Sequence, residues 1–210
     1  MSRVTRQSHD ARRAASSALI VCGALLLIGS ATSVARGAIA RDAARSRWAE
    51  MEAERAVVGA KLSTGGARWS EARGTPVARV IIPRLGLDEV VVEGVGDDEL
   101  RAGPGHMIGS VLPGDRGTSV ISAHRDRHFY ALGGIAVGDT VVTESASGTV
   151  VWTVSRIRVV GADDSALDAR PTPTLMLTTC WPIRYVGPAP DRLIVEAEIA
   201  GKREEGSGKR

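Results

Sequence analysis

The chain has 210 residues, of which 43% are hydrophobic and 24% are charged, so it can form one globular domain with extensions and is too apolar to be disordered. Aromatic residues make up only 3% of the chain, which excludes a single-stranded nucleic-acid binder built on stacking platforms. The net charge is +3, and arginines gather on both sides of an N-terminal apolar run. We interpret this basic excess as membrane-flanking charge, not as a nucleic-acid surface.

The apolar run covers residues 14–35 and contains no charged residue. As a helix it is long enough to cross a hydrocarbon core of roughly 30 Å. The small-x-small sequence Ala38-Ile39-Ala40 offers an alternative, in which the run is a removable signal peptide. The length of the run and Arg36 before that sequence favour a retained signal anchor. We therefore expect residues 1–13 to be a short cytoplasmic tail and the rest to form an extracytoplasmic domain of a single-pass protein in the cell membrane.

Residues 36–76 are expected to form a juxtamembrane helix and a linker. The stretch 41–62 is rich in Ala, Arg and Glu, which favours a helix continuing from the apolar run. The stretch 63–76 contains Gly, Ser and Pro, which is typical of a linker. At the other end, residues 201–210 form a charged tail that we expect to be flexible.

Between residues 77 and 200 the sequence predicts one strand after another, rich in Val, Ile and Thr and separated by Gly and Pro turns. A short helix is expected after Asp97, with Asp97 as its N-cap. Many short strands with little helix indicate an all-β domain, a closed or nearly closed β-barrel. The expected strands are Val77–Ile82, Glu89–Glu93, Thr118–Ala123, Asp139–Glu144, Thr149–Val160, Thr174–Thr179 and Arg192–Ile199.

The chain has two cysteines, and only one of them lies in the globular part. Cys22 lies inside the apolar run, so it cannot pair with Cys180 in a water-soluble domain. An exported domain with one unpaired cysteine is a candidate for a reactive thiol. The alternative is a buried, inert Cys180 that acts as a small hydrophobic residue.

A reactive thiol needs a base or a cation beside it, and two residues can provide these. His124 and Cys180 each follow an expected strand, so both can project from one end of a barrel. Arg192 opens the last strand, where a guanidinium can stabilise an oxyanion. Taken singly, such a histidine or arginine is more often a solvated surface residue. Zinc fits poorly because Cys180, His124 and His128 lack the usual ligand spacing, so no metal or cofactor is expected.

Two stretches of sequence resemble motifs of the sortase family. PGDRGTSVISAHRD, residues 113–126, is similar to the histidine motif of sortases, with Phe129-Tyr130 following it. LTTCWP, residues 177–182, is similar to the cysteine motif, and YVGPAPDRLIV, residues 185–195, carries the arginine and the last strand. These contexts are most similar to class D sortases. The chain has Ala123 and Thr118 where many relatives have Gly and Asn, which affects the subclass and not the reacting groups.

The resemblance implies a closed, eight-stranded sortase-type β-barrel over residues 77–200, with one or two short helices and a transmembrane helix before it. It implies a cysteine transpeptidase that cleaves an LPxTG-like sorting signal through a Cys180 thioester. His124 would transfer protons, Arg192 would orient substrate and oppose the oxyanion charge, and Thr179 would help to shape the oxyanion site through its backbone or hydroxyl.

The partners implied are surface proteins that carry a sorting signal and an amino acceptor from a cell-wall precursor or a pilin. Two other functions stay open at this point. The same residues would serve a cysteine protease that releases surface proteins by hydrolysis. A catalytically silent barrel would instead act as an envelope binding module. The product formed in the presence of an amine acceptor distinguishes the transpeptidase from the protease. An inert, buried Cys180 would indicate the binding module.

Overall fold

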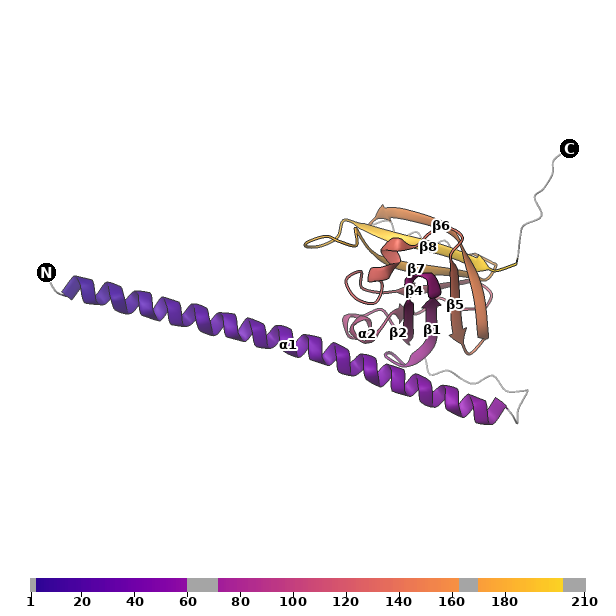
Figure 1. The fold of residues 1–210 in the computed structure, drawn as a ribbon, viewed down its shortest axis with the longest axis horizontal. Coiled ribbons are helices and arrows are strands. Elements are labelled where there is room, and N and C mark those ends of the chain that lie inside the picture. The colour runs from indigo at the N-terminus through magenta and orange to yellow at the C-terminus, as the bar shows by residue number, and fades with distance from the viewer. Residues whose placement is uncertain (1–2, 60–71, 163–169, 202–210) are drawn as a thin grey trace. The chain divides into compact units, whose positions relative to one another are not determined.

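The computed structural model describes residues 3–59, 72–162 and 170–201 (Figure 1). Contacts between residues divide the chain into two units, Met1–Ala40 and Arg41–Arg210. Most of the expected linker 63–76 and nearly all of the expected tail 201–210 lie outside the described residues.

The first element is a single helix, α1 (Arg3–Gly59), which contains the apolar run and much of the expected juxtamembrane helix. Between Leu19 and Arg55 it is long and apolar enough to cross a membrane, by length and composition. Its large apolar side chains in this run are exposed, including Leu25, Leu26 and Leu27. Such a surface is stable in lipid and unfavourable in water. The helix is therefore able to act as a membrane anchor.

The second unit contains eight strands that close into a barrel in the order β1-β2-β3-β4-β7-β8-β6-β5 (Figure 1). Among the described residues of this unit, three short helices accompany the strands, namely η1 (Pro83–Leu85), α2 (Asp97–Ala102) and η2 (Tyr130–Gly134). The expected all-β fold, a closed eight-stranded barrel with short helices, is confirmed. The strands are β1 (Pro76–Ile82), β2 (Leu87–Glu93), β3 (Gly105–His106), β4 (Thr118–Ser122), β5 (Thr140–Ser145), β6 (Gly148–Gly161), β7 (Thr174–Trp181) and β8 (Asp191–Ile199).

Three local predictions need correction. The two-residue strand β3 was not predicted, because Gly105 and His106 carry no strand pattern and are held by hydrogen bonding to β2 and β4. Asp97 is the first residue of α2, and Gly96, in extended conformation, is the N-cap. Strand β7 runs on to Trp181, so Cys180 lies inside the strand and not after it.

The strands that carry the candidate site residues have a rigid core beneath them. Ile121 of β4, Leu177 of β7 and Val195 of β8 are completely buried in one apolar cluster. Trp152, also completely buried there, donates a hydrogen bond of 2.7 Å from Nε1 to Thr143 Oγ1. Close packing of this kind holds the neighbouring backbone in place.

The strand directions bring four chain segments to one end of the barrel. β4 and β7 are parallel, and β8 is antiparallel to β7. β2 is parallel to β3, which is antiparallel to β4. The ends of β4 and β7 and the starts of β8 and β2 therefore share one end of the barrel, which we call the site end.

Candidate active site

The pairing of β4 with β7 brings His124 and Cys180 to the same end of the barrel. Ser122 is the register partner of Thr178, and the N–H of Ala123 donates to the carbonyl oxygen of Thr178 at 3.2 Å. His124 lies two residues past Ser122, and Cys180 lies two residues past Thr178, so both residues lie at the site end. Both residues are half-buried, so each combines a fixed backbone with access to solvent.

The pairing of β7 with β8 places Arg192 directly opposite Cys180. Side chains of directly opposed residues lie on the same face of an antiparallel pair. Arg192 Nη1 donates to the carbonyl oxygens of Asp191 at 2.9 Å and Ala189 at 3.4 Å, which fixes the position of the guanidinium. The thiol and the cation therefore belong to one face of the barrel, at the site end.

Thr179 points away from this face. Because side chains alternate along a strand, Thr179 lies on the interior side of β7 with Leu177, and only 2% of its surface is exposed. Its Oγ1 donates to the carbonyl oxygen of Ala123 at 2.7 Å. The hydroxyl thus braces the backbone immediately before His124, and its backbone groups remain next to Cys180.

We call residues 123–129, between β4 and η2, the histidine loop. Phe129 closes the loop by inserting its completely buried ring into the barrel core. The N–H of Phe129 donates to the carbonyl oxygen of His124 at 3.1 Å. The histidine is therefore carried by a short loop that is anchored at both ends.

Burial lowers the pKa of His124, because desolvation disfavours the imidazolium. Nearby charges act in both directions: Asp126 and Asp97 raise the pKa of His124, and Arg127 and His128 lower it. The net effect is a pKa below the ordinary histidine value of about 6.5. At neutral pH the imidazole is then mostly neutral, the form that can accept a proton from a thiol.

Two charge-neutralising substitutions are expected to move this pKa in opposite directions. Asp126→Asn removes a carboxylate that favours the imidazolium, so the pKa of His124 should fall. Arg127→Gln removes a cation that disfavours it, so the pKa should rise. An NMR titration of the His124 ring in both variants measures the shifts. Shifts of equal sign would contradict this description of the electrostatics.

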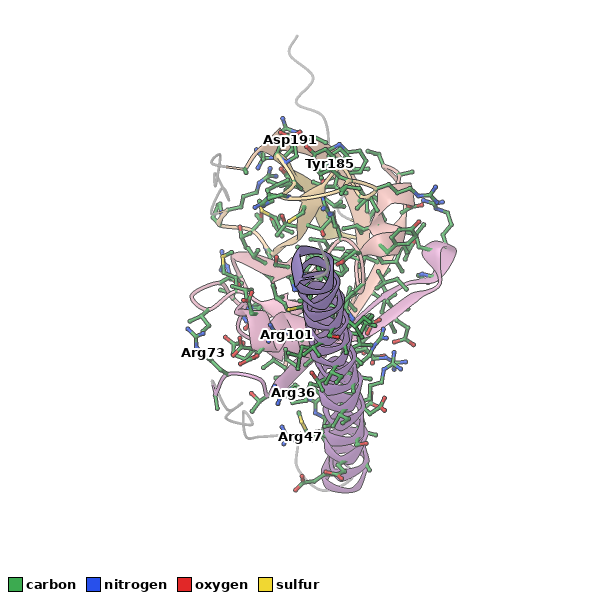
Figure 2. The ribbon with its side chains drawn as sticks, turned by 90° about the vertical axis from the view of Figure 1, so that its left-hand side faces the viewer. Arg36, Arg47, Arg73, Arg101, Tyr185 and Asp191 are labelled. Carbon is green, nitrogen blue, oxygen red and sulfur yellow. The ribbon has the colours of Figure 1, made fainter. Side chains whose placement is uncertain are left out.

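Arg125, the residue after His124, ties the histidine loop to residues 182–190, which we call the cysteine connection because they join β7 to β8. Its guanidinium donates to the carbonyl oxygens of Pro182 at 3.1 Å, Tyr185 at 3.1 Å and Gly187 at 2.8 Å. Its Cζ also lies 5.6 Å from the centroid of the Tyr185 ring. Figure 2 labels Tyr185 on this connection. The sequence motif contains Arg125 but gave no reason to assign it this role.

Arg125→Lys is expected to lower kcat/KM of the activity proposed below by about tenfold, because a single ammonium cannot serve three carbonyl groups in a fixed fork. Arg116→Lys is the matched control, since Arg116 belongs to the same motif and is exposed. Steady-state kinetics of both variants check the prediction. Equal kinetics for the two would show that Arg125 does not position the site.

A second histidine cluster resembles a hydrolase triad but cannot act as one. His106 lies between Glu93, with Nδ1 2.7 Å from Oε2, and Ser110, with Nε2 2.9 Å from Oγ. His106 Nε2 also lies 3.0 Å from the carbonyl oxygen of Val111, which can only accept, so Nε2 is a donor. The Ser110 hydroxyl itself donates to the carbonyl oxygen of Met107 at 2.8 Å. This hydroxyl has no base to activate it, and the cluster is a buried structural network.

Comparison with known proteins points to one family. The family model described as "Sortase domain" matches residues 80–200, more than half of the chain. Sortase D of Bacillus subtilis (strain 168) is 35% identical over 124 residues, which cover 58% of this chain and 61% of that relative. The match thus spans less than two thirds of the relative's length.

Solved structures agree with the sequence comparison. The catalytic domain of B. anthracis SrtD is 34% identical, with a TM-score of 0.54, covering 67% of this chain and 97% of that chain. The Clostridium perfringens Sortase D5 transpeptidase has a TM-score of 0.60 and covers 80% of this chain and 99% of that chain. Its sequence identity is 21%, so this second likeness concerns the fold.

Proposed function

The chain belongs to the sortase family, and we propose that it is a membrane-anchored cysteine transpeptidase that cleaves an LPxTG-like sorting signal. The observation that carries the proposal is the strand register, which brings Cys180, His124 and Arg192 to one end of the barrel. A thiol, a largely neutral imidazole and a guanidinium are the three groups that acyl transfer through a thioester requires.

In the first half of the reaction, Cys180 loses its proton to His124 and its thiolate attacks the carbonyl carbon of the threonine in the sorting signal. A C–S bond forms, and the carbonyl oxygen becomes an oxyanion. As this intermediate collapses, the C–N bond breaks and the imidazolium of His124 gives its proton to the leaving amine. The product of this half is a thioester on Cys180.

In the second half, an amine attacks the thioester and His124 accepts a proton from the attacking nitrogen. A new amide bond forms, the C–S bond breaks, and Cys180 leaves as a thiolate, which takes the proton from His124 and restores the starting state. Arg192 opposes the oxyanion charge in both halves from its position across from Cys180. The hydroxyl of Thr179 already donates to the carbonyl oxygen of Ala123, so it is the backbone of Thr179 that would contribute to the same oxyanion site.

The proposed partners follow from this chemistry. The acyl donor is a surface protein that carries the sorting signal, and the acceptor is an amine of a cell-wall precursor or a pilin. Residues 14–35 of α1 would anchor the chain as a single pass, with residues 1–13 in the cytoplasm and the barrel, residues 77–200, on the extracytoplasmic side. The exposed apolar surface of α1 supports the anchor.

The test uses the full-length protein in detergent micelles, an LPxTG-like peptide and a primary amine such as a short glycine peptide. We expect cleavage of the peptide with formation of a new amide to the amine, detected by mass spectrometry. If only the free acid forms at saturating amine, the protein is a hydrolytic protease. If the peptide stays intact across a panel of sorting-signal variants, the proposal is wrong.

A further inference from the structure

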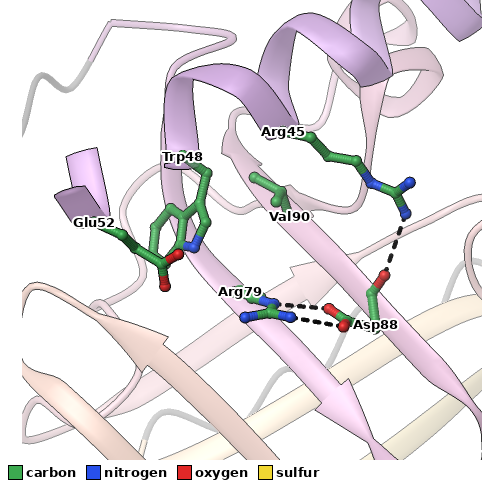
Figure 3. Close-up of a pocket in the computed structure, with 6 residues that line it drawn as sticks. All are labelled: Arg45, Trp48, Glu52, Arg79, Asp88 and Val90. Carbon is green, nitrogen blue, oxygen red and sulfur yellow. Dashed lines mark hydrogen bonds and ion pairs between the residues drawn. The ribbon is translucent and has the colours of Figure 1, made fainter. Parts of the chain in front are cut away.

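Residues 41–55 of α1, which we call the docked segment, pack against the outer side of β2. Ala44 and Trp48 are buried in an apolar cluster with Val90 and Val92. Figure 3 shows Trp48 next to Val90, with Arg45 reaching towards the backbone of Asp88. This part of α1 therefore belongs to the folded domain and not only to the anchor.

A hollow of about 360 Å³, open to solvent, lies beside this contact (Figure 3). Its lining includes three charged side chains that reach it from the docked segment and from β1, namely Arg45, Glu52 and Arg79. The contact between the docked segment and the barrel therefore has a polar rim beside its apolar cluster.

The central polar contact is the carboxylate of Glu89, only 7% of which is exposed. Arg41 contacts both of its oxygens, with Nε 3.3 Å from Oε2 and Nη2 bonded to Oε1. Arg45 Nη2 lies 3.7 Å from Oε2. The ring of His128, in the histidine loop, has its Nδ1 at 3.5 Å from Oε1. One buried carboxylate thus touches the docked segment and the loop that carries His124.

The topology explains why these groups meet. Glu89 lies near the start of β2, at the site end of the barrel, and β3 pairs with β2 only at Val92 and Glu93. The edge of β2 beside Glu89 is therefore available to other elements, and the buried His128 lies there. Burial alone would raise the pKa of Glu89, but the nearby His128 and Arg41 together outweigh it and lower the pKa. The carboxylate is therefore charged.

We propose that Glu89 is a positioning residue that couples the docked segment to the histidine loop, so that His124 is correctly placed only when residues 41–55 are docked. The inference rests on the proposed transpeptidase function and adds a regulatory contact to it. The barrel would reach full activity with the helix in place and lower activity when the helix is detached.

The physical basis is the cost of a buried charge without its partner. When the Arg41 contacts are lost, the remaining neighbours of Glu89 are Arg45 at 3.7 Å and His128 at 3.5 Å. A shift of the carboxylate towards either of them changes its contact with the buried His128 ring, four residues from His124. His128 already lowers the pKa of His124, so the two rings are electrostatically linked. Small displacements of a reacting group are known to reduce turnover strongly.

The test compares full-length variants in detergent micelles. Arg41→Ala removes the hydrogen-bond donor that the docked segment offers to Glu89, Glu89→Gln removes the charge of Glu89, and Arg41→Lys keeps a single cation. Arg47→Ala is the matched control, because Arg47 is exposed on the same helix (Figure 2). The measurements are kcat and KM for peptide cleavage, and NMR resonances of the His124 and His128 rings.

For Arg41→Ala we expect kcat to fall about tenfold with KM within about twofold of wild type, and both histidine resonances to shift. Arg41→Lys should recover part of the lost kcat, and Arg47→Ala should behave as wild type. Histidine resonances and kcat of Arg41→Ala equal to those of Arg47→Ala would overturn the inference. If Glu89→Gln does not fold, the Arg41 variants still test the inference, because the Arg41 side chain is more exposed than that of Glu89. Wild-type protein without transfer activity would refute the proposed function, and the NMR comparison would still test the coupling.

Discussion

Replacing Cys180 with alanine is expected to reduce both peptide cleavage and amine transfer by at least about 10³-fold, because the proposed thioester forms on the Cys180 thiol. We do not expect this loss to come from unfolding, because Cys180 is half-buried and both cysteines of the chain are free. The measurement is the rate of amide formation with saturating peptide and amine.

Cys22→Ala is the matched control for this substitution, since Cys22 is the other cysteine and lies exposed on α1. It should leave the rate unchanged. Melting temperatures of the two variants, measured by circular dichroism, show whether any loss reflects unfolding. Turnover that survives in Cys180→Ala at a tenth of the wild-type rate or more would remove Cys180 from the mechanism.

Arg192→Ala is expected to lower kcat by about 10²- to 10³-fold, the usual cost of removing a group that stabilises an oxyanion. Arg192→Lys should recover only part of this loss, because an ammonium keeps the charge but cannot reproduce the planar fork. The register partner of Arg192 is Cys180, so the guanidinium is close to where the oxyanion would form. Single-turnover kinetics on acylation give the effect on the chemical step.

The control for Arg192 is Arg184, an arginine of the cysteine connection that leads into β8. Its Nε donates to the hydroxyl of Tyr130 at 3.0 Å, and its side chain is exposed. Arg184→Ala should change acylation by less than threefold, roughly the effect expected of a surface interaction. If Arg192→Ala and Arg184→Ala had similar acylation rates, Arg192 would be a structural residue of β8.

Most of the barrel was predictable from the sequence, because its strands carry their own pattern. Runs such as VVWTVSRIRVV alternate in polarity, and the structure has β6 over this stretch. β3 was not predictable, since two residues become a strand only through their neighbours. The extension of β7 beyond Thr179 was also missed, because pairing of Cys180 and Trp181 with β8 prolongs the strand.

The reacting groups of the candidate site were predictable from the sequence, but the contacts that hold them in place were not. The motifs around His124 and Cys180 indicated the reacting groups. The partners of Arg125 lie 57 to 62 residues further along the chain and are backbone carbonyl groups, which leave no mark in the sequence. The contact of Arg41 with Glu89 spans 48 residues, and nothing in either local sequence indicates it. Long-range polar contacts of this type depend on the fold, and the fold must be known before they can be found.

The most direct test of the proposed mechanism is to detect the thioester itself. The full-length protein is mixed with an LPxTG-like peptide in the absence of an amine, quenched in acid, and analysed by intact-protein and peptide mass spectrometry. We predict an added mass equal to the peptide up to its threonine, located on Cys180 and removed by hydroxylamine. Peptide cleavage without an adduct, or an adduct on any residue other than Cys180, would contradict the proposal that Cys180 is the nucleophile.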